Sequence, residues 1–241
     1  MRRSNGHARM YVSKAHVAAT LFFVFAPFAF VLIFSKLAHI AAPILLVDIA
    51  ISIIRLFFGY IIAALLGWGL AIAFYRGKRA IVALPIFDVL QSFPTFAALP
   101  LAIWLWGPSN TTVIIFLVLT IIWPIFFSVV SAMKLIKHEW EEAAQIMNLR
   151  GWNFFKLFLL PISIPSLVTG SIIGLGEGWE AIVATEIIVG MKSGLGNFFS
   201  SYSANTGVTT FGILGLLLLI FSVNKILWLP LLEKTHEKLA E

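Results

Sequence analysis

Residues 134–166 read KLIKHEWEEAAQIMNLRGWNFFKLFLLPISIPS, the one stretch of the sequence in which charged side chains cluster beside regularly spaced apolar ones. The apolar residues recur at intervals of three and four, the spacing of one face of an amphipathic helix. That predicted face comprises Ile136, Trp140, Ala143, Ala144 and Met147. The opposite face carries Lys137, His138, Glu141 and Glu142.

The helix is expected to end near Asn148, because asparagine tolerates the left-handed backbone conformation better than other non-glycine residues and Gly151 follows closely. A second short amphipathic helix is expected over residues 152–160, with Pro161 and Pro165 stopping it. The residues alone are equally consistent with an amphipathic loop that lies on a membrane surface.

Long apolar runs flank this connection. Of the 241 residues, 60% are hydrophobic and 12% are charged, about half the charged share of a soluble domain. A helix needs about 20 apolar residues to cross a bilayer, and six runs meet or approach that length. They lie at residues 17–34, 49–75, 80–106, 111–133, 162–189 and 211–232. We therefore predict an all-α membrane protein in which residues 1–241 form one transmembrane domain of six helices.

The first and third runs differ from simple membrane spans. The first follows a basic segment, as in a secretory signal peptide, but it is longer than usual and no small-x-small cleavage site closes it, so we expect it to be retained. In the third, we expect a short helix near the membrane surface and a shorter span from about Pro94. The interrupting residues are Pro85, Asp88, Gln91, Ser92, Pro94 and Pro100.

Small residues recur every four positions in two of the runs, which places them on one helix face where another backbone can approach closely. They are Gly59, Ala63, Gly67 and Ala71, and Gly170, Gly174 and Gly178. The pattern predicts close helix packing, either within one subunit or across a dimer.

Basic residues indicate the topology. If the N-terminus is cytoplasmic, the segments on that side carry Arg2, Arg3, Arg9, Lys14, Arg76, Lys78, Arg79, Lys134, Lys137, Arg150, Lys156, Lys234 and Lys238. The opposite side carries Lys36 and Lys192. This bias predicts an even number of spans with both termini in the cytoplasm.

Several classes of function are disfavoured. The net charge of +6 is divided between apolar runs rather than gathered on one face, which argues against nucleic-acid binding. The chain has no cysteine, and its histidines lack the spacing of metal ligands, so no metal site is expected. No GxxxxGK[ST] phosphate loop and no catalytic constellation is present, so we expect neither ATP hydrolysis by this chain nor a membrane enzyme.

The 134–161 connection resembles the EAA loop of ABC importer permeases, whose pattern is Glu-Ala-Ala, three residues, Gly, then nine residues before Ile-x-Leu-Pro. The matching positions are Glu142, Ala143, Ala144, Asn148, Leu160 and Pro161. Asn148 replaces the family's Gly and Phe158 its Ile, both mild changes. Residues 52–67, 92–107 and 179–196 are similar to the subgroup that imports nitrate, sulfonates and taurine.

The resemblance implies the type I permease fold of a prokaryotic inner-membrane importer. In that family the loop forms coupling helices in a groove of a separate ATPase, which binds ATP and magnesium. Ala143 and Ala144 would permit a close approach, Glu142 would pair with a basic group, and Gly151 would belong to the same coupling segment. Further implied partners are a second permease copy or paralogue, an extracytoplasmic solute-binding protein and membrane lipid. Residues 192–210 would form a short outer helix for the binding protein, or a plain loop.

Charged residues within the spans are costly in hydrocarbon, at least a few kcal/mol each, and must face partners, a cavity or water. They are Arg55, Glu177, Glu180 and Glu186. Glu177 and Glu180 share a helix face beside Trp179. They either line the translocation pathway or form a structural ion pair, with Arg55 or with another subunit. Glu186 either belongs to the pathway or anchors the loop at 190–196.

The solute and the energy source stay open at this point. Carboxylates in a pathway repel anions, so a neutral or cationic nutrient competes with the nitrate or sulfonate of the resembled subgroup. The alternative function is an ion-driven secondary transporter or channel in which Glu177 and Glu180 bind protons or cations. That function usually requires internal repeats, and the sequence shows none that is convincing.

Overall fold

The computed structural model describes residues 14–232 and residue 235, and this part of the chain contains helices and no strand. The elements are α1 (Lys14–Leu37), α2 (Ala42–Phe74), α3 (Gly77–Gln91), the 3₁₀ turn η1 (Thr95–Ala98), α4 (Leu99–Trp106), α5 (Asn110–Lys134), α6 (His138–Ile146), α7 (Gly151–Phe154), the π-helical turn η2 (Phe155–Leu159), α8 (Leu160–Val189), α9 (Leu195–Ser201), α10 (Thr206–Val223) and the π-helical turn η3 (Asn224–Trp228). The prediction of an all-α protein is confirmed.

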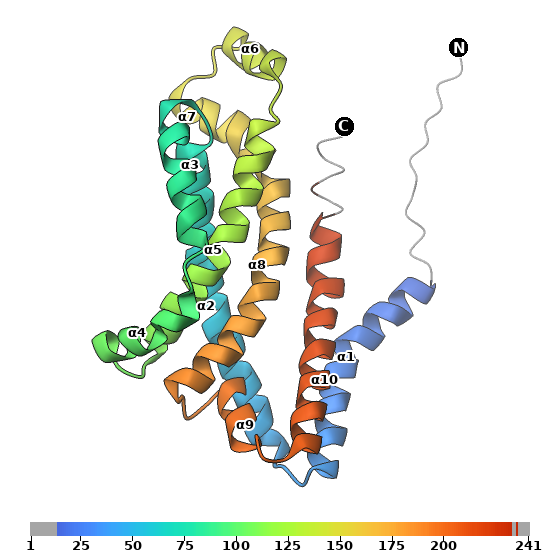
Figure 1. Cartoon of the computed structure of the whole chain (residues 1–241). Helices are drawn as coiled ribbons and strands as arrows, with labels where there is room; N and C mark the ends of the chain where they lie inside the picture. The colour runs from blue at the N-terminus through green and yellow to red at the C-terminus, as the bar shows by residue number, and fades with distance from the viewer. Residues whose placement is uncertain (1–13, 233–234, 236–241) are drawn as a thin grey trace.

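Five helical runs in the described residues are long and apolar enough to cross a membrane. They are Thr20–Leu37, Ala42–Phe74, Asn110–Lys134, Gly151–Val189 and Thr206–Leu232. Figure 1 shows α2 and α5 running in the same direction, with α3 returning the chain between them, and it shows α6 at one end of the bundle and α9 at the other. A sixth crossing is made if α3 and the segment Thr95–Trp106 together count as one span.

That sixth crossing is bent by 72° between α3 and the segment Thr95–Trp106. With 15 residues in α3 and 8 in α4, the two helices are only about 22 and 12 Å long, less than the ~30 Å of hydrocarbon. The break near Pro94 matches the prediction, but the expected independent span after it does not exist. Pro94 disfavours helix in the residue that precedes it, which separates α3 from the segment after the break, whereas Pro100 lies in the first turn of α4, where proline is tolerated.

The prediction that Pro161 and Pro165 stop the second short helix is wrong. Helix continues from Gly151 to Val189 as one run. Pro161 lies in the first turn of α8, directly after the π-helical turn η2. A proline is tolerated in a first turn, and the wider π turn changes which carbonyl lies below its ring, so the usual clash with the preceding turn is relieved.

Glycines bring both α2 and α8 close against α5. A Cβ built on Gly59 would lie 2.7 Å from Leu117 Cβ, and one on Gly170 would lie 2.7 Å from Ile125 Cα. Gly174 likewise faces Ile121. The small-residue pattern therefore serves packing within the subunit. The resulting core holds the buried side chains of α5, including Leu117, Ile121 and Ile125.

The remaining helices flank this core. α1 and α10 lie side by side at one edge of the bundle (Figure 1). α9 packs Phe198 and Phe199 into the core from the end opposite α6. The residues predicted to be functional lie in two regions of this arrangement: the 134–161 connection at the α6 end, and the charged residues of α2 and α8 within the spans.

Candidate functional site

The turn after α6 has the backbone that its sequence predicts. Asn148 has φ of 55° and Gly151 has φ of 54°, both in the left-handed region that asparagine and glycine tolerate best. α6 ends at Ile146 and α7 begins at Gly151. The expected end of the helix near Asn148 is confirmed, and the two left-handed residues fix the angle at which the second helix leaves.

α6 is attached to the bundle at two points. Ala144 is buried, and Glu141 accepts a hydrogen bond from Arg76, which lies between α2 and α3. Burial acts to lower the pKa of Arg76, but the hydrogen bond and the charges of Glu141 and Tyr75 raise it above its ordinary value overall, so the guanidinium keeps its charge. Glu141, predicted on the charged outer face, is thus turned toward the protein.

Most of the predicted apolar face of α6 lies outside the protein core. Trp140 and Met147 of that face are 49% and 72% exposed, and Ile146 and Trp152, which lie outside it, are 85% and 71% exposed. Ala143 and Glu142 are exposed beside them, and Glu142 lies 3.3 Å from the imidazole of His138. Leu160 is half-buried and Pro161 is exposed at the start of α8. The 134–161 connection therefore presents aromatic and aliphatic side chains next to carboxylates.

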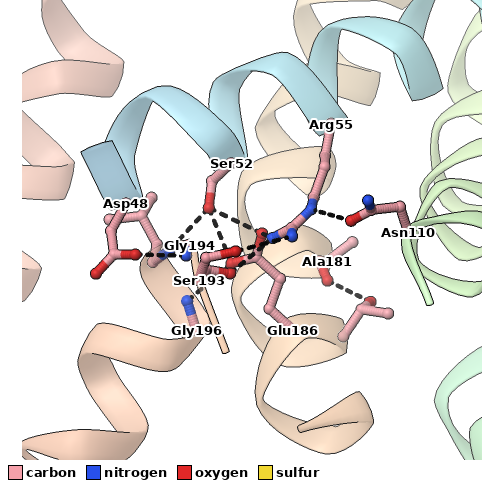
Figure 2. A network of polar contacts seen from close by, with 11 residues as sticks. Asp48, Ser52, Arg55, Asn110, Ala181, Glu186, Ser193, Gly194 and Gly196 are labelled. Carbon is pink, nitrogen blue, oxygen red and sulfur yellow. Dashed lines mark hydrogen bonds and ion pairs between the residues drawn. The ribbon is translucent and has the colours of Figure 1, made fainter. Parts of the chain in front are cut away.

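Within the membrane, Arg55 of α2 and Glu186 of α8 form a buried ion pair. Arg55 Nη1 lies 2.6 Å from Glu186 Oε1, and the two side chains are 7% and 0% exposed. The Ser52 hydroxyl lies 2.9 Å and 2.8 Å from the two carboxylate oxygens. Arg55 also donates to the Asn110 side chain and to the Ser193 carbonyl, each at 2.8 Å. Figure 2 shows these groups converging between α2 and α8.

The same network holds the loop between α8 and α9. The backbone amide of Gly194 donates to Asp48 at 2.7 Å, that of Leu195 to the Ser52 hydroxyl at 2.7 Å, and that of Gly196 to Glu186 at 2.9 Å. Gly194 has φ of 110° and a Cβ there would lie 2.5 Å from the Glu186 carboxylate. Only glycine fits this position, so the close contact between the loop and the Glu186 carboxylate requires Gly194.

The carboxylate of Glu186 is not left free for a solute. Each carboxylate oxygen of Glu186 has partners, and no buried side-chain nitrogen or oxygen in the described residues is unpartnered. Asp48, Ser52 and Asn110 were not predicted as site residues. The spacing of Asp48, Ser52 and Arg55 at four and three residues, one polar stripe on an apolar helix, was the available signal.

Glu177 and Glu180 are placed differently from Glu186. Both are exposed on α8, whereas Trp179 between them is buried in the core. Arg55, one partner considered for them, is bound to Glu186 instead. In the part of the chain that the structure describes, no group of three or more His, Asp or Glu side chains is arranged to hold a metal ion.

The known proteins to which this chain is similar are membrane components of transport systems. Residues 63–227 match the family described as the inner membrane component of binding-protein-dependent transport systems. The chain is 32% identical to the nitrate import permease protein NrtB of Leptolyngbya laminosa over 179 residues, 71% of this chain and 64% of that protein. For NrtB of a Synechocystis strain the identity is 31%, over 71% of this chain and 65% of the relative.

The taurine transport system permease protein TauC of Escherichia coli is 28% identical over 200 residues, 77% of this chain and 72% of that protein. The matched region covers less than two thirds of the length of either NrtB protein.

Proposed function

The chain belongs to the family of inner membrane components of binding-protein-dependent transport systems, and from this premise we propose that it is the permease subunit of an ATP-driven importer. Its spans form the solute pathway, and separate ATPase subunits, which bind ATP and magnesium, supply the energy. The names of its relatives, a nitrate import permease and a taurine transport permease, support a transport role.

The observation that carries this proposal is the exposed apolar surface of the 134–161 connection. Exposed aromatic and aliphatic side chains that adjoin one another mark a protein or membrane contact. Helices that lie on a membrane surface are usually rich in Lys and Arg. α6 reads HEWEEAAQI, with three glutamates and no Lys or Arg. An acidic helix with an exposed Trp140 fits a protein groove with a basic rim better than it fits an anionic lipid surface.

The attachments of α6 suggest how force reaches the spans. Glu141 joins α6 to Arg76 at the junction of α2 and α3, and the left-handed turn at Asn148 joins it to the helical run that becomes α8. A movement of α6 by the ATPase would therefore displace the membrane helices together. In this scheme, closure of the ATPase pair on binding ATP switches the cavity from inward-facing to outward-facing.

The rest of the assembly follows from the surfaces and charges of the chain. Glu177 and Glu180 are exposed on α8 and are costly toward lipid, so a second permease copy or a paralogue is proposed to cover that face. The excess of basic residues around the α6 end supports the proposal that this end and both termini lie in the cytoplasm. The solute-binding protein would dock at the α9 end, where Ser200 and Ser201 are exposed.

The test is affinity purification of the tagged chain from its native membrane in mild detergent, followed by mass spectrometry. Wild type is expected to recover an ATPase, and Glu142→Lys plus Ala143→Asp is expected to lose it. A matched control, Ser203→Lys plus Ala204→Asp, introduces the same two charges at the α9 end and should retain the ATPase.

Recovery of no ATPase by intact wild type would refute the proposal. The ion-driven transporter would then become the better-supported function, because Glu177 and Glu180, which have no ion pair within the described residues, lie on one face of α8. Equal loss of the ATPase in both double variants would contradict the role of α6, since it would trace the loss to general disruption.

A further inference from the structure

A cavity of about 590 Å³ opens at the break between α3 and α4, against α5 and α8. Its size falls within the range of sites for organic molecules, roughly 300 to 1,000 Å³, and far exceeds an inorganic anion of a few atoms. Glu177 is the only ionisable side chain among its lining residues. The wall also includes Phe93, Phe96, Trp123, Gln91 and Thr120.

The electrostatics of this cavity are negative. In the described part of the chain Glu177 has neither a hydrogen bond nor an ion pair, and Glu180, one turn further along the same face, is also exposed. Arg55 cannot compensate them, because its guanidinium is held by Glu186, Asn110 and Ser193. An anion entering the cavity would therefore meet a carboxylate to which the described residues of this chain supply no neighbouring cation.

The basic residues of the other described helices do not change this. They are Lys36, Lys78, Arg79 and Lys134 of α1, α3 and α5, and Lys156 and Lys225 of the turns η2 and η3. None of them lines the cavity.

We infer that the solute of this permease is an organic cation with a flat ring, in contrast to the nitrate and taurine for which its relatives are named. This inference rests on the proposed transport function and gives its substrate class. The Glu177 carboxylate neutralises the cation, and the faces of Trp123, Phe93 and Phe96 stack on its ring and attract its charge. Gln91 and Thr120 provide hydrogen bonds for ring substituents.

The experiment measures the charge preference of the cavity, so it does not depend on knowing the physiological solute. The full chain, with any ATPase that co-purifies, is placed in lipid nanodiscs and studied by equilibrium dialysis against empty nanodiscs. The probes are 1-methylquinolinium and 1-naphthoate, which share a fused-ring shape and carry opposite charges. Nitrate and taurine are added as competitors.

Wild type is expected to bind 1-methylquinolinium at least ~10-fold more tightly than 1-naphthoate, and nitrate and taurine should not compete. Glu177→Gln keeps the shape of the side chain and should reduce the preference several-fold, while the aromatic side chains and Glu180 retain part of it. Glu139→Gln removes a carboxylate at the α6 end and should leave it unchanged. Tighter binding of naphthoate, absence of saturable cation binding, or an unchanged preference in Glu177→Gln would overturn the inference.

The two proposals fail separately. An ATPase recovered together with an anion-preferring cavity refutes the substrate class alone. A cation-preferring cavity in a chain that recovers no ATPase refutes the ATP-driven importer alone. If Glu177→Gln does not yield folded protein, the wild-type comparison of the two probes still decides the charge preference.

Discussion

Replacing Glu186 by Gln, which keeps the size of the side chain, should destabilise the protein strongly. Glu186 Oε1 accepts from Arg55 and Oε2 accepts from the backbone amide of Gly196. A glutamine has one acceptor oxygen, so its amide nitrogen must face one of these two donors. The charge-assisted bond that is lost contributes roughly 1.5–3 kcal/mol and the buried donor left unmet costs roughly 1–3 kcal/mol. We expect a loss of about 3 kcal/mol in the free energy of unfolding.

The assay is unfolding by denaturing detergent in mixed micelles, followed by the fluorescence of the eight tryptophans. A double-mutant cycle with Arg55→Met and Glu186→Met isolates the ion pair. Each single change leaves a buried charge or an unsatisfied network, whereas the double change removes both charges. The two single losses together should exceed the loss in the double variant by at least ~1.5 kcal/mol.

A local measurement checks that the loop is what the pair holds. The chain has no cysteine, so Leu195→Cys introduces a single thiol at a buried position. Adding Glu186→Gln should speed its reaction with maleimide, and Glu180→Gln, an exposed carboxylate on the same helix, should not. If the two Met changes prove additive within ~0.5 kcal/mol, and the labelling rate of Leu195→Cys is unaffected, the assignment of this network as a scaffold is refuted.

Two further predictions use the same unfolding assay. Asn148→Val should cost about 1–2 kcal/mol because a β-branched side chain is strained at φ of 55°, whereas Asn148→Gly should be neutral or stabilising; an equal effect of both would show that the left-handed turn is not required. Gly170→Ala should cost about 1–3 kcal/mol by forcing α8 away from α5, while Gly176→Ala, which meets nothing within 4 Å, should be neutral or gain up to ~1 kcal/mol. Equal losses at the two glycines would refute the close approach.

Hydropathy and local backbone preference made much of the fold predictable. A lipid-facing helix must be apolar over about 20 residues whatever its neighbours, so five of the spans could be located from sequence. The turn at Asn148 was predictable because its cause, the steric limit on a left-handed residue, is local. The continuation of helix past Pro161 was not, since the π turn before it carries no pattern that distinguishes it from an ordinary helix end.

Partners distant in the sequence were harder to predict. Arg55 and Glu186 are separated by 131 residues, and the sequence analysis considered Glu177 and Glu180, but not Glu186, as partners of this arginine. The spacing of the carboxylates shows which of them share a face of α8, but not which face of α8 meets α2. The rotation of α8 about its own axis is set by Gly170 and Gly174, which allow it to pack closely on α5. Such a contact is visible only in three dimensions.

The start of α9 explains why Glu186 differs in its role from the other two carboxylates of α8. The first backbone amides of a helix have no partner within it, and at α9 those of Leu195 and Gly196 are buried. Ser52 and Glu186 accept from them, so α2 and α8 together cap a helix at the end of the bundle opposite α6. Every oxygen of Glu186 is thereby used, and Arg55 is fixed by the same arrangement. Of the three carboxylates of α8, Glu177 and Glu180 are therefore the two that have no hydrogen bond or ion pair within the described residues and that can act on a solute.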